Sequence, residues 1–405
     1  MNSAKLQALT FFTLLAPAAC LMVFFAGKGF AGLGGAAGVI AIAIILLRRQ
    51  ARLVLALPSS QLLLAWIFLG LLSATWSLDA ANSLDTMQGL SGMLIAALCL
   101  LGLAQTLPEA SDEAKRYFAW ILVGSFLLLT GLLLLDQATQ GGVYRATIGW
   151  LKRRNDWIPN INIRSGVYVT LLVWPVMLAA YWATRRLWLP LVVFIIGAIA
   201  AYVSPQVTAK LAFGAGVMAF AFVWLGGRRM SFILGMLICL TVVTLPFLLG
   251  SRFDADYVME RYPTLHYSAA HRLHVWDFVI ERYFERPWLG WGIDAARLLP
   301  GGNALLPSGG EQVPSHPHNG ILQFWLELGV PGGLLLAVGQ FTIWRSITNA
   351  ALTPMARALA AAAFITALGY FLVSFNSWHS WWVGLLGASF SLLIAALRSF
   401  GQQPR

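Results

Sequence analysis

Two histidines and an asparagine stand together in this sequence, immediately before a long apolar segment. They belong to the run Pro-Ser-His-Pro-His-Asn-Gly at positions 314–320. Histidine is the side chain whose unperturbed pKa lies nearest to neutral pH, so it can take up or release a proton there at little cost. His318 and His316 are therefore the first candidates for proton-transfer chemistry, although a histidine at such a boundary can also serve only as a cap or an interfacial residue.

The residues around the histidines predict how they are held. Proline disfavours helix in the residue before it, so Pro314 and Pro317 keep the segment extended and His316 comparatively mobile. Asn319 is a good N-cap for the helix that follows. Asn319, Gln323 and Glu327 are spaced four apart, so they form one polar stripe on that helix. A carboxylate two turns inside an apolar span is costly unless it is paired or faces a cavity, so this stripe needs polar partners.

The composition is that of an integral membrane protein with many spans. The chain has 405 residues, of which 59% are hydrophobic and 11% charged, whereas soluble proteins average about 25% charged residues. A spanning helix needs about 20 apolar residues, and runs of this kind predict an all-α fold of about twelve transmembrane helices. We expect these helices near residues 6–26, 30–47, 58–75, 88–107, 117–136, 163–183, 187–203, 208–226, 231–250, 319–344, 357–376 and 380–398.

Cysteine usage and net charge narrow the class further. Cys20, Cys99 and Cys239 all fall within apolar runs, which argues against a disulfide framework or a metal site. The net charge of +11 bears on topology and lipid head groups before it bears on nucleic acid.

Basic residues in the short loops predict the orientation of the chain in the membrane. With the N-terminus in the cytoplasm, the inside loops carry most of the short-loop lysines and arginines, and both termini are cytoplasmic. The chain then divides into nine transmembrane helices in residues 1–250, one large periplasmic loop at 251–318, and three further helices in 319–405. The first apolar run continues into other spans, so we expect a retained helix rather than a cleaved signal peptide.

Some outside segments are more basic than the orientation rule predicts, which suggests a functional reason. Residues 137–164 include Lys152, Arg154 and Arg164, and Lys210 stands near the outer end of the eighth span. For Arg164 and Lys210 the alternative is snorkelling to lipid head groups. A long loop can also be translocated regardless of its charge.

An amphipathic helix is predicted in the large loop. Apolar residues recur at helical spacing from Ser268 to Arg286, and Pro287 ends the run. Such a helix is suited to lying on the membrane surface. Arg272 and Trp276 lie one turn apart on it. Arginine binds phosphate oxygens through a bidentate fork, although a surface salt bridge would also account for Arg272.

Taken together, these motifs resemble those of the O-antigen ligase and polymerase superfamily. The resemblance is carried by the helix number, the large late loop, the His-Asn pair at 318–319 and the run Glu-Leu-Gly-Val-Pro-Gly-Gly at 327–333. Two upstream motifs extend it: Arg-Leu-His-Val-Trp at 272–276 and Pro-Trp-Leu-Gly-Trp-Gly at 287–292. The specific motifs cover residues 268–333. The size and the single dominant loop are most similar to those of the O-antigen ligases.

The resemblance implies an activity. It implies a glycosyltransferase that moves O-antigen polysaccharide from undecaprenyl pyrophosphate to the lipid A–core oligosaccharide, at the periplasmic face of the Gram-negative inner membrane, without a metal or other cofactor. His318 would be the general base, with a near-neutral pKa, and Arg272 and Arg164 would bind the pyrophosphate, with Lys210 assisting. The implied substrate-binding residues are Arg164, Lys210, His316, Asn319, Arg154, Lys152 and Trp276. Relatives have arginine where Lys210 stands, so lysine would supply the charge without the fork.

Three alternative functions stay open on the sequence alone. Two are related enzymes, an O-antigen polymerase and a protein O-oligosaccharyltransferase. The third is a transporter or flippase for an anionic lipid-linked glycan. The transporter is disfavoured because no paired discontinuous spans recur in two halves of the chain.

Overall fold

The computed structural model describes residues 3–149, 163–252, 255–262, 264–306, 310–313 and 315–403. Within this part of the chain the regular structure is helical, with two isolated β-bridges. The helices, in chain order, are α1 (Ser3–Phe25), η1 (Gly27–Gly29), α2 (Phe30–Leu47), α3 (Ala51–Leu55), α4 (Pro58–Ser73), α5 (Ala80–Gln105), α6 (Asp112–Ala138), α7 (Gly142–Tyr144), η2 (Arg145–Gly149), α9 (Ile163–Thr184), α10 (Trp188–Val203), α11 (Val207–Arg252), α12 (Ala255–Arg261), α13 (Tyr267–Glu285), η4 (Ala296–Leu298), α14 (Gly320–Asn349), α15 (Pro354–Val373) and α16 (Ser380–Phe400).

The predicted fold class, an all-α integral membrane protein, is confirmed. Among the described residues, nine helices are long and apolar enough to cross a membrane. Two shorter apolar helices, α4 and α10, have 16 residues each. Every segment predicted from hydropathy falls on one of these helices. Two of the predicted segments, 208–226 and 231–250, fall on the same helix, α11. Gly227 interrupts α11 between the two, with a non-helical φ of 57° and ψ of −136°.

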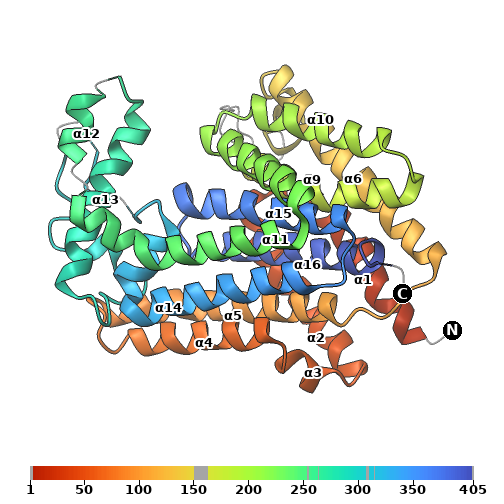
Figure 1. Ribbon diagram of the computed structural model, residues 1–405, viewed down its shortest axis with the longest axis horizontal. Helices are drawn as coiled ribbons and strands as arrows, with labels where there is room; N and C mark the ends of the chain where they lie inside the picture. The colour runs from red at the N-terminus through yellow and green to blue at the C-terminus, as the bar shows by residue number, and fades with distance from the viewer. Residues whose placement is uncertain are drawn as a thin grey trace.

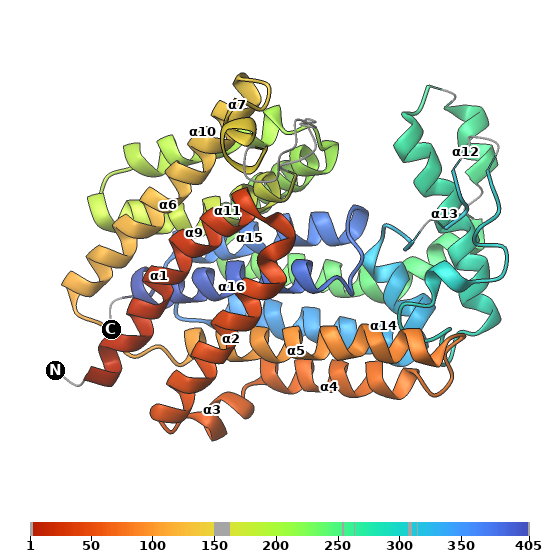
Figure 2. The same cartoon turned by 180° about the vertical axis from the view of Figure 1, so that it is seen from behind.

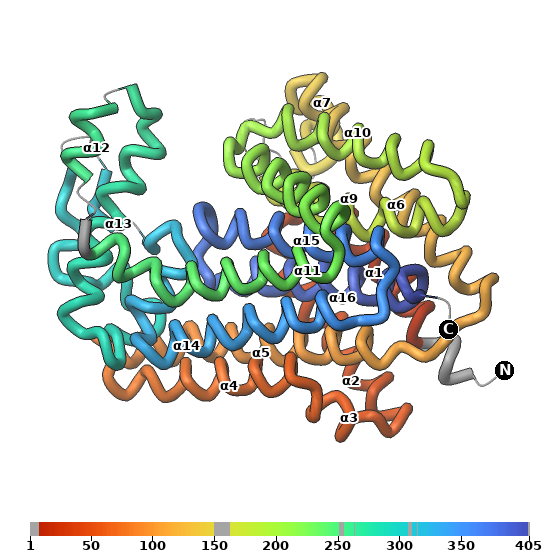
Figure 3. Tube along the Cα trace, in the orientation of Figure 1, coloured from red at the N-terminus to blue at the C-terminus, as the bar shows by residue number. Residues whose placement is uncertain are grey.

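The two termini lie at one end of the helical array, and α12 and α13 lie at the other end (Figures 1 and 2). Between these ends, α4 and α5 run along one side, and α11, α14, α15 and α16 run through the middle. Helices α6, α9 and α10 lie along the other side, as the Cα trace also shows (Figure 3). The helices of the 251–318 segment thus stand opposite the termini, which is the arrangement that the predicted orientation requires.

Two buried apolar clusters hold the helices together. One of them joins α1, α2, α6, α9, α10 and α16. The other joins α11, α14 and α15, and it extends into α13 and the segment after it through Val279, Trp291 and Ile293. These three side chains are at most 5% exposed, so the 251–318 segment is packed against the protein core.

Helix α13 confirms the predicted amphipathic helix but not its expected setting. Its bounds, Tyr267–Glu285, are within a residue of the prediction. The apolar side chains of Val275, Phe278 and Tyr283 are buried, in a cluster that α13 shares with α11 and α14. Most of the apolar face is therefore covered by the ends of spanning helices, so little of it is left to rest on a membrane surface. Phe284 remains 45% exposed.

Helix α14 is broken at Gly329, and the break makes room for the segment at 287–292. Gly329 has a φ of 60° and a ψ of −154°, and a Cβ there would lie 2.5 Å from the carbonyl oxygen of Trp288. Only glycine allows this approach without strain. Three backbone N–H groups donate across the contact: Trp291 to Leu326, Gly292 to Glu327 and Val330 to Pro287. The motifs at 287–292 and 327–333 are thus joined by main-chain hydrogen bonds.

Candidate active site

His318 precedes α14 in an uncommon backbone conformation. Asn319 caps the helix as predicted, because its Oδ1 accepts from the N–H of Leu322 at 3.1 Å. His318 has a φ of 53°, a left-handed value in which histidine is enriched and most side chains are strained. Strained residues of this kind cluster at functional sites. Here the conformation brings the ring to the loop between α15 and α16, where it meets Ser374.

A single backbone carbonyl orients both histidine rings. His318 Nδ1 lies 3.2 Å from the carbonyl oxygen of Ser374, and His316 Nε2 lies 3.3 Å from the same oxygen. A carbonyl oxygen only accepts hydrogen bonds, so each of these ring nitrogens carries the proton. The neutral His318 is then the Nδ1–H tautomer, and its Nε2 holds the lone pair. This geometry gives His318 the basic nitrogen that a general base requires.

His316 differs from His318 because its other nitrogen is occupied. The hydroxyl of Ser315 donates to His316 Nδ1 at 2.8 Å. The ring centre lies 4.2 Å from that of His318, and the residue is 6% exposed. The expectation that His316 is comparatively mobile is therefore wrong, because burial and two hydrogen bonds fix its ring. With both nitrogens engaged, His316 is suited to holding His318 in place.

Burial lowers the pKa of both histidines well below the ordinary value. Desolvation, reinforced by the positive charge of Arg272, brings the pKa of His316 to about 3 and that of His318 to about 4. The near-neutral pKa expected for His318 is wrong for this reason. Both imidazoles are neutral at pH 7, so His318 can accept a proton without first losing one.

Helix α13 brings Arg272 and Trp276 to the histidine segment. The indole N–H of Trp276 donates to the carbonyl of Pro317 at 3.0 Å, which ties the segment to α13. Arg272 Nη1 donates to the carbonyl of Ser268 at 2.8 Å and also to its hydroxyl. The Nε of Arg272 is buried without a partner, and within the described residues its guanidinium forms no ion pair. The alternative of a surface salt bridge is therefore not supported there. Arg272 is a half-buried cation able to receive an anion.

The polar stripe predicted on α14 holds the loop that supplies Ser374. Gln323 Nε2 donates to Asn376 Oδ1 at 2.9 Å, and Gln323 Oε1 accepts from the backbone N–H of Ser377 at 3.0 Å. Gln323 is 1% exposed. Its amide thus fixes residues two and three positions beyond Ser374, and through them the carbonyl that orients the histidines.

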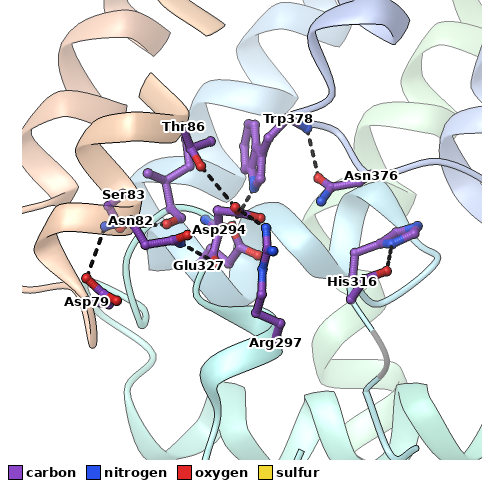
Figure 4. A network of polar contacts seen from close by, with 12 residues as sticks. Asp79, Asn82, Ser83, Thr86, Asp294, Arg297, His316, Glu327, Asn376 and Trp378 are labelled. Atoms are coloured by element: carbon purple, nitrogen blue, oxygen red, sulfur yellow. Dashed lines mark hydrogen bonds and ion pairs between the residues drawn. The ribbon is translucent and has the colours of Figure 1, made fainter. Parts of the chain in front are cut away.

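Glu327 is the fully buried end of the stripe and has the partners it was expected to need. Its carboxylate accepts from the indole N–H of Trp378 and from the backbone N–H of Asp294, both at 2.5 Å. Asp294 in turn accepts from the hydroxyl of Thr86 at 2.9 Å and from Arg297 (Figure 4). Asp294 and Arg297 were not predicted as site residues. They come after the motif at 287–292, and no spacing in the sequence relates them to Glu327. The network connects α5, α14 and the α15–α16 loop.

A third histidine extends the site toward α9. His379 precedes α16, and its ring centre lies 6.2 Å from that of His316 and 6.3 Å from that of Trp381. The guanidinium carbon of Arg164 lies 4.6 Å from the centre of the Trp381 ring. Arg164, proposed from the sequence, therefore reaches the site through these two residues. The signal that could have found His379 is the polar run between two spans, which mirrors the run before α14.

The other predicted cations are not part of this cluster. Lys210 is exposed on α11, with its Nζ 5.4 Å from the centre of the Tyr202 ring. Lys152 and Arg154 lie outside the described residues. The structure thus brings together five of the predicted site residues at the histidine segment, namely His318, His316, Asn319, Arg272 and Trp276.

The arrangement can take a proton from a hydroxyl group next to a bound anion. His318 supplies a neutral nitrogen base of fixed tautomer, and Arg272 supplies a cation without a carboxylate partner. In the part of the chain that the structure describes, no three histidine, cysteine, aspartate or glutamate side chains are grouped so as to hold a metal ion. The fold and the site together define a multi-pass membrane protein with a histidine and arginine centre at one end of its helices.

Comparison with known proteins matches the segment that builds this centre. Residues 191–337 match the family model of the O-antigen ligases. A protein of Rickettsia conorii is 30% identical over 188 residues, which are 45% of this chain and 44% of the relative. A protein of Rickettsia prowazekii is 34% identical over 139 residues, 33% of this chain and 34% of the relative. Both bear the name "Putative polysaccharide ligase". The chain spans less than half the length of either relative.

These matches support membership of the O-antigen ligase superfamily, which the motifs of the sequence resemble. Arg272, His316, His318 and Asn319 all lie within the matched segment, whereas Arg164 lies outside it.

Proposed function

We propose that this protein is a glycosyltransferase of the O-antigen ligase type. It transfers O-antigen polysaccharide from undecaprenyl pyrophosphate to the lipid A–core oligosaccharide, at the periplasmic face of the inner membrane, with both of its termini in the cytoplasm. The observation that carries the proposal is the hydrogen bond from His318 Nδ1 to the carbonyl of Ser374, which leaves Nε2 as the base on a segment that α13, the helix of Arg272, contacts through Trp276. The named ligases among its relatives support the same activity.

The proposed step is a displacement at the anomeric carbon of the donor. The acceptor hydroxyl oxygen forms the new glycosidic bond while the bond from the anomeric carbon to the pyrophosphate oxygen breaks. The hydroxyl proton passes to His318 Nε2, and the electron pair of the broken bond leaves with the pyrophosphate. Direct displacement inverts the anomeric configuration. A positioned base of this kind contributes about 10²–10⁴-fold to the rate.

The carbonyl of Ser374 assists as His318 becomes charged. It accepts a hydrogen bond from Nδ1–H in the neutral ring and keeps that bond in the imidazolium, so it raises the pKa of His318 against the opposing effect of burial. The ring cannot turn over without breaking this bond, which keeps Nε2 directed at the acceptor. His316 and Asn319 support this placement from either side.

Arg272 receives the leaving group. Its Ser268 contacts orient the guanidinium, and donors aimed at developing negative charge stabilise a transition state more than they stabilise a ground state. Trp276 holds the histidine segment against the same helix. Lys152, Arg154 and Lys210 add positive charge that attracts the anionic donor. The pyrophosphate is already an activated leaving group, so the reaction proceeds without a metal or other cofactor.

The test is transfer by the purified protein in detergent, with donor and acceptor supplied. His318→Ala should lower the initial rate by about 10²–10⁴-fold. The matched control is His274→Ala, since His274 lies on α13 with its ring 3.8 Å from Asp256, and it should transfer at the wild-type rate. If His318→Ala retains more than a small fraction of the rate, the proposal is wrong.

Deletion of the gene separates the ligase from its alternatives in the cell. Loss of the O-antigen ladder with an intact core on lipopolysaccharide gels supports the ligase. A core that carries a single repeat would indicate a polymerase. Unchanged lipopolysaccharide with an unglycosylated protein acceptor would indicate a protein O-oligosaccharyltransferase.

A further inference from the structure

A second group of basic and aromatic side chains lies beyond His316, around the start of α16. Its members come from three separate elements: Lys28 from η1, Arg164 from the first turn of α9, and His379 and Trp381 from the start of α16. Sequence reasoning connected only Arg164 with substrate, and it assigned that residue to the same pyrophosphate as Arg272.

Arg164 is held in place but is not neutralised. Its side-chain stem lies over Gly27, where a Cβ would come within 3.0 Å of Arg164 Cδ. Its guanidinium lies over the face of Trp381, 4.6 Å from the ring centre. Its Nε is buried without a partner, and in the described ranges the guanidinium forms no ion pair. A fixed, unpaired arginine beside an aromatic face is suited to bind a phosphate group.

The N-terminus of α16 adds to this positive field. His379 is the N-cap residue, and no side chain caps the first turn of the helix. The N–H of Trp382 donates to the carbonyl of His379, so the N–H groups of Ser380 and Trp381, together with the helix dipole, are the ones that favour an anion there. Burial lowers the pKa of His379, and the charges of Arg164, Arg297 and Lys28 lower it further, while Asp294 opposes them.

Arg272 and Arg164 influence different histidines of the site. The charge of Arg272 lowers the pKa of His318 and of His316, whereas the charge of Arg164 lowers that of His379. In an inverting displacement the nucleophile and the leaving group lie on opposite faces of the anomeric carbon. Arg272 is assigned to the leaving group, so Arg164, which lies with Trp381 and His379, is available to bind the acceptor.

We propose that Lys28, Arg164, His379 and Trp381 form a second subsite, which binds a phosphate group on the acceptor saccharide. Arg164 and Lys28 contact the phosphate, the start of α16 contributes backbone N–H donors, and the indole of Trp381 lies against the adjoining sugar ring. An aromatic face with a few convergent polar groups is the usual composition of such a pocket. This inference rests on the proposed function, because it names the acceptor of the same reaction.

Kinetics with each substrate varied in turn test the assignment. Arg164→Gln should raise KM for a phosphorylated lipid A–core acceptor about tenfold, the change expected when one charge-assisted hydrogen bond is lost. Trp381→Leu should also raise this KM, because the sugar ring loses its aromatic contact. KM for the donor and kcat should stay close to the wild-type values. The matched control is Arg185→Gln, which removes another arginine over a tryptophan, 5.4 Å from the ring centre of Trp182, and it should change neither KM. A rise in the donor KM, or an unchanged acceptor KM, would overturn the subsite.

A binding measurement separates this inference from the proposed function. The detergent-solubilised protein is titrated with lipid A–core and with the same molecule after its phosphates are removed. Wild type should bind the phosphorylated form about tenfold more tightly, and Arg164→Gln should lose this preference. If wild type transfers no glycan but shows the preference, and the variant loses it, the proposed function fails and the subsite stands. If wild type transfers glycan but the variant keeps the preference, only the subsite fails.

Discussion

Replacing Gln323 by leucine should impair proton transfer to His318, although Gln323 does not contact that ring. Gln323 lies one turn into α14. Within the described residues, its side-chain amide forms hydrogen bonds only with Glu327 and with the loop after α15. Leucine has nearly the same size but offers neither donor nor acceptor. The buried N–H of Ser377 then loses its partner, and the loop that presents the Ser374 carbonyl to His318 is no longer fixed.

The expected magnitude follows from these contacts. A buried backbone N–H without a partner costs about 1–3 kcal/mol, so the loop should move to regain one rather than stay in place. A displacement of about 1 Å in a reacting group can lower a rate about 10²-fold. We therefore expect Gln323→Leu to reduce transfer about 10–100-fold, less than the loss expected for His318→Ala.

The assay is the initial rate of transfer in detergent, measured for single and double variants. On a His318→Ala background, Gln323→Leu should have little further effect, because it acts through the ring that is already gone. Gln340→Leu is the matched control, since Gln340 lies on the same helix, is 8% exposed and has a buried Oε1 without a partner. The reasoning is refuted if Gln323→Leu keeps the wild-type rate, or if it lowers the rate by the same factor in both backgrounds.

Three further predictions use other features of the chain. Arg272→Lys keeps the charge but loses the guanidinium fork, so transfer should fall at least about tenfold; a near-normal rate would reduce Arg272 to a surface role. The pKa of His318 is lowered to about 4, so the neutral base persists as the pH falls, and the initial rate should decline only near that value. A decline centred on the ordinary histidine pKa would contradict the buried setting. Cysteines introduced at Gly302 and Gln402 should react with an impermeant thiol reagent from opposite sides of the membrane, and labelling from one side would disprove the orientation.

The helices could be predicted because hydropathy depends on local composition. The predicted bounds are wrong at the helix ends, where polar residues form part of the helix. Helix α5 begins at Ala80 and α6 at Asp112, ahead of the apolar runs, because Asp79 and Ser111 cap them. Hydropathy excludes such polar first turns, whereas capping hydrogen bonds include them.

The site could be predicted only where residues are neighbours along one element. Spacing along α14 placed Gln323 and Glu327 together, and Gln323 Nε2 donates to Glu327 Oε1. Asn319, at the start of the stripe, caps the helix instead. The carbonyl that orients His318 comes from Ser374, 56 residues later in the chain. A backbone carbonyl has no residue type to recognise, so no pattern in the sequence could reveal that contact.

The break in α14 has a consequence for how the protein is made. The half before Gly329 carries two buried polar side chains, Gln323 and Glu327, whereas the half after it is mainly apolar. A polar side chain within a helix raises the free energy of insertion, by about 2.5–3.5 kcal/mol where it is charged and central, so the first half of α14 inserts less favourably than the apolar second half. The donor that Glu327 needs from Trp378 is synthesised 51 residues later, together with the loop that orients His318. On the proposed mechanism, a nascent chain therefore lacks an oriented base until α15 and the loop that carries Ser374 are in place, and a copy that stops before them is catalytically silent.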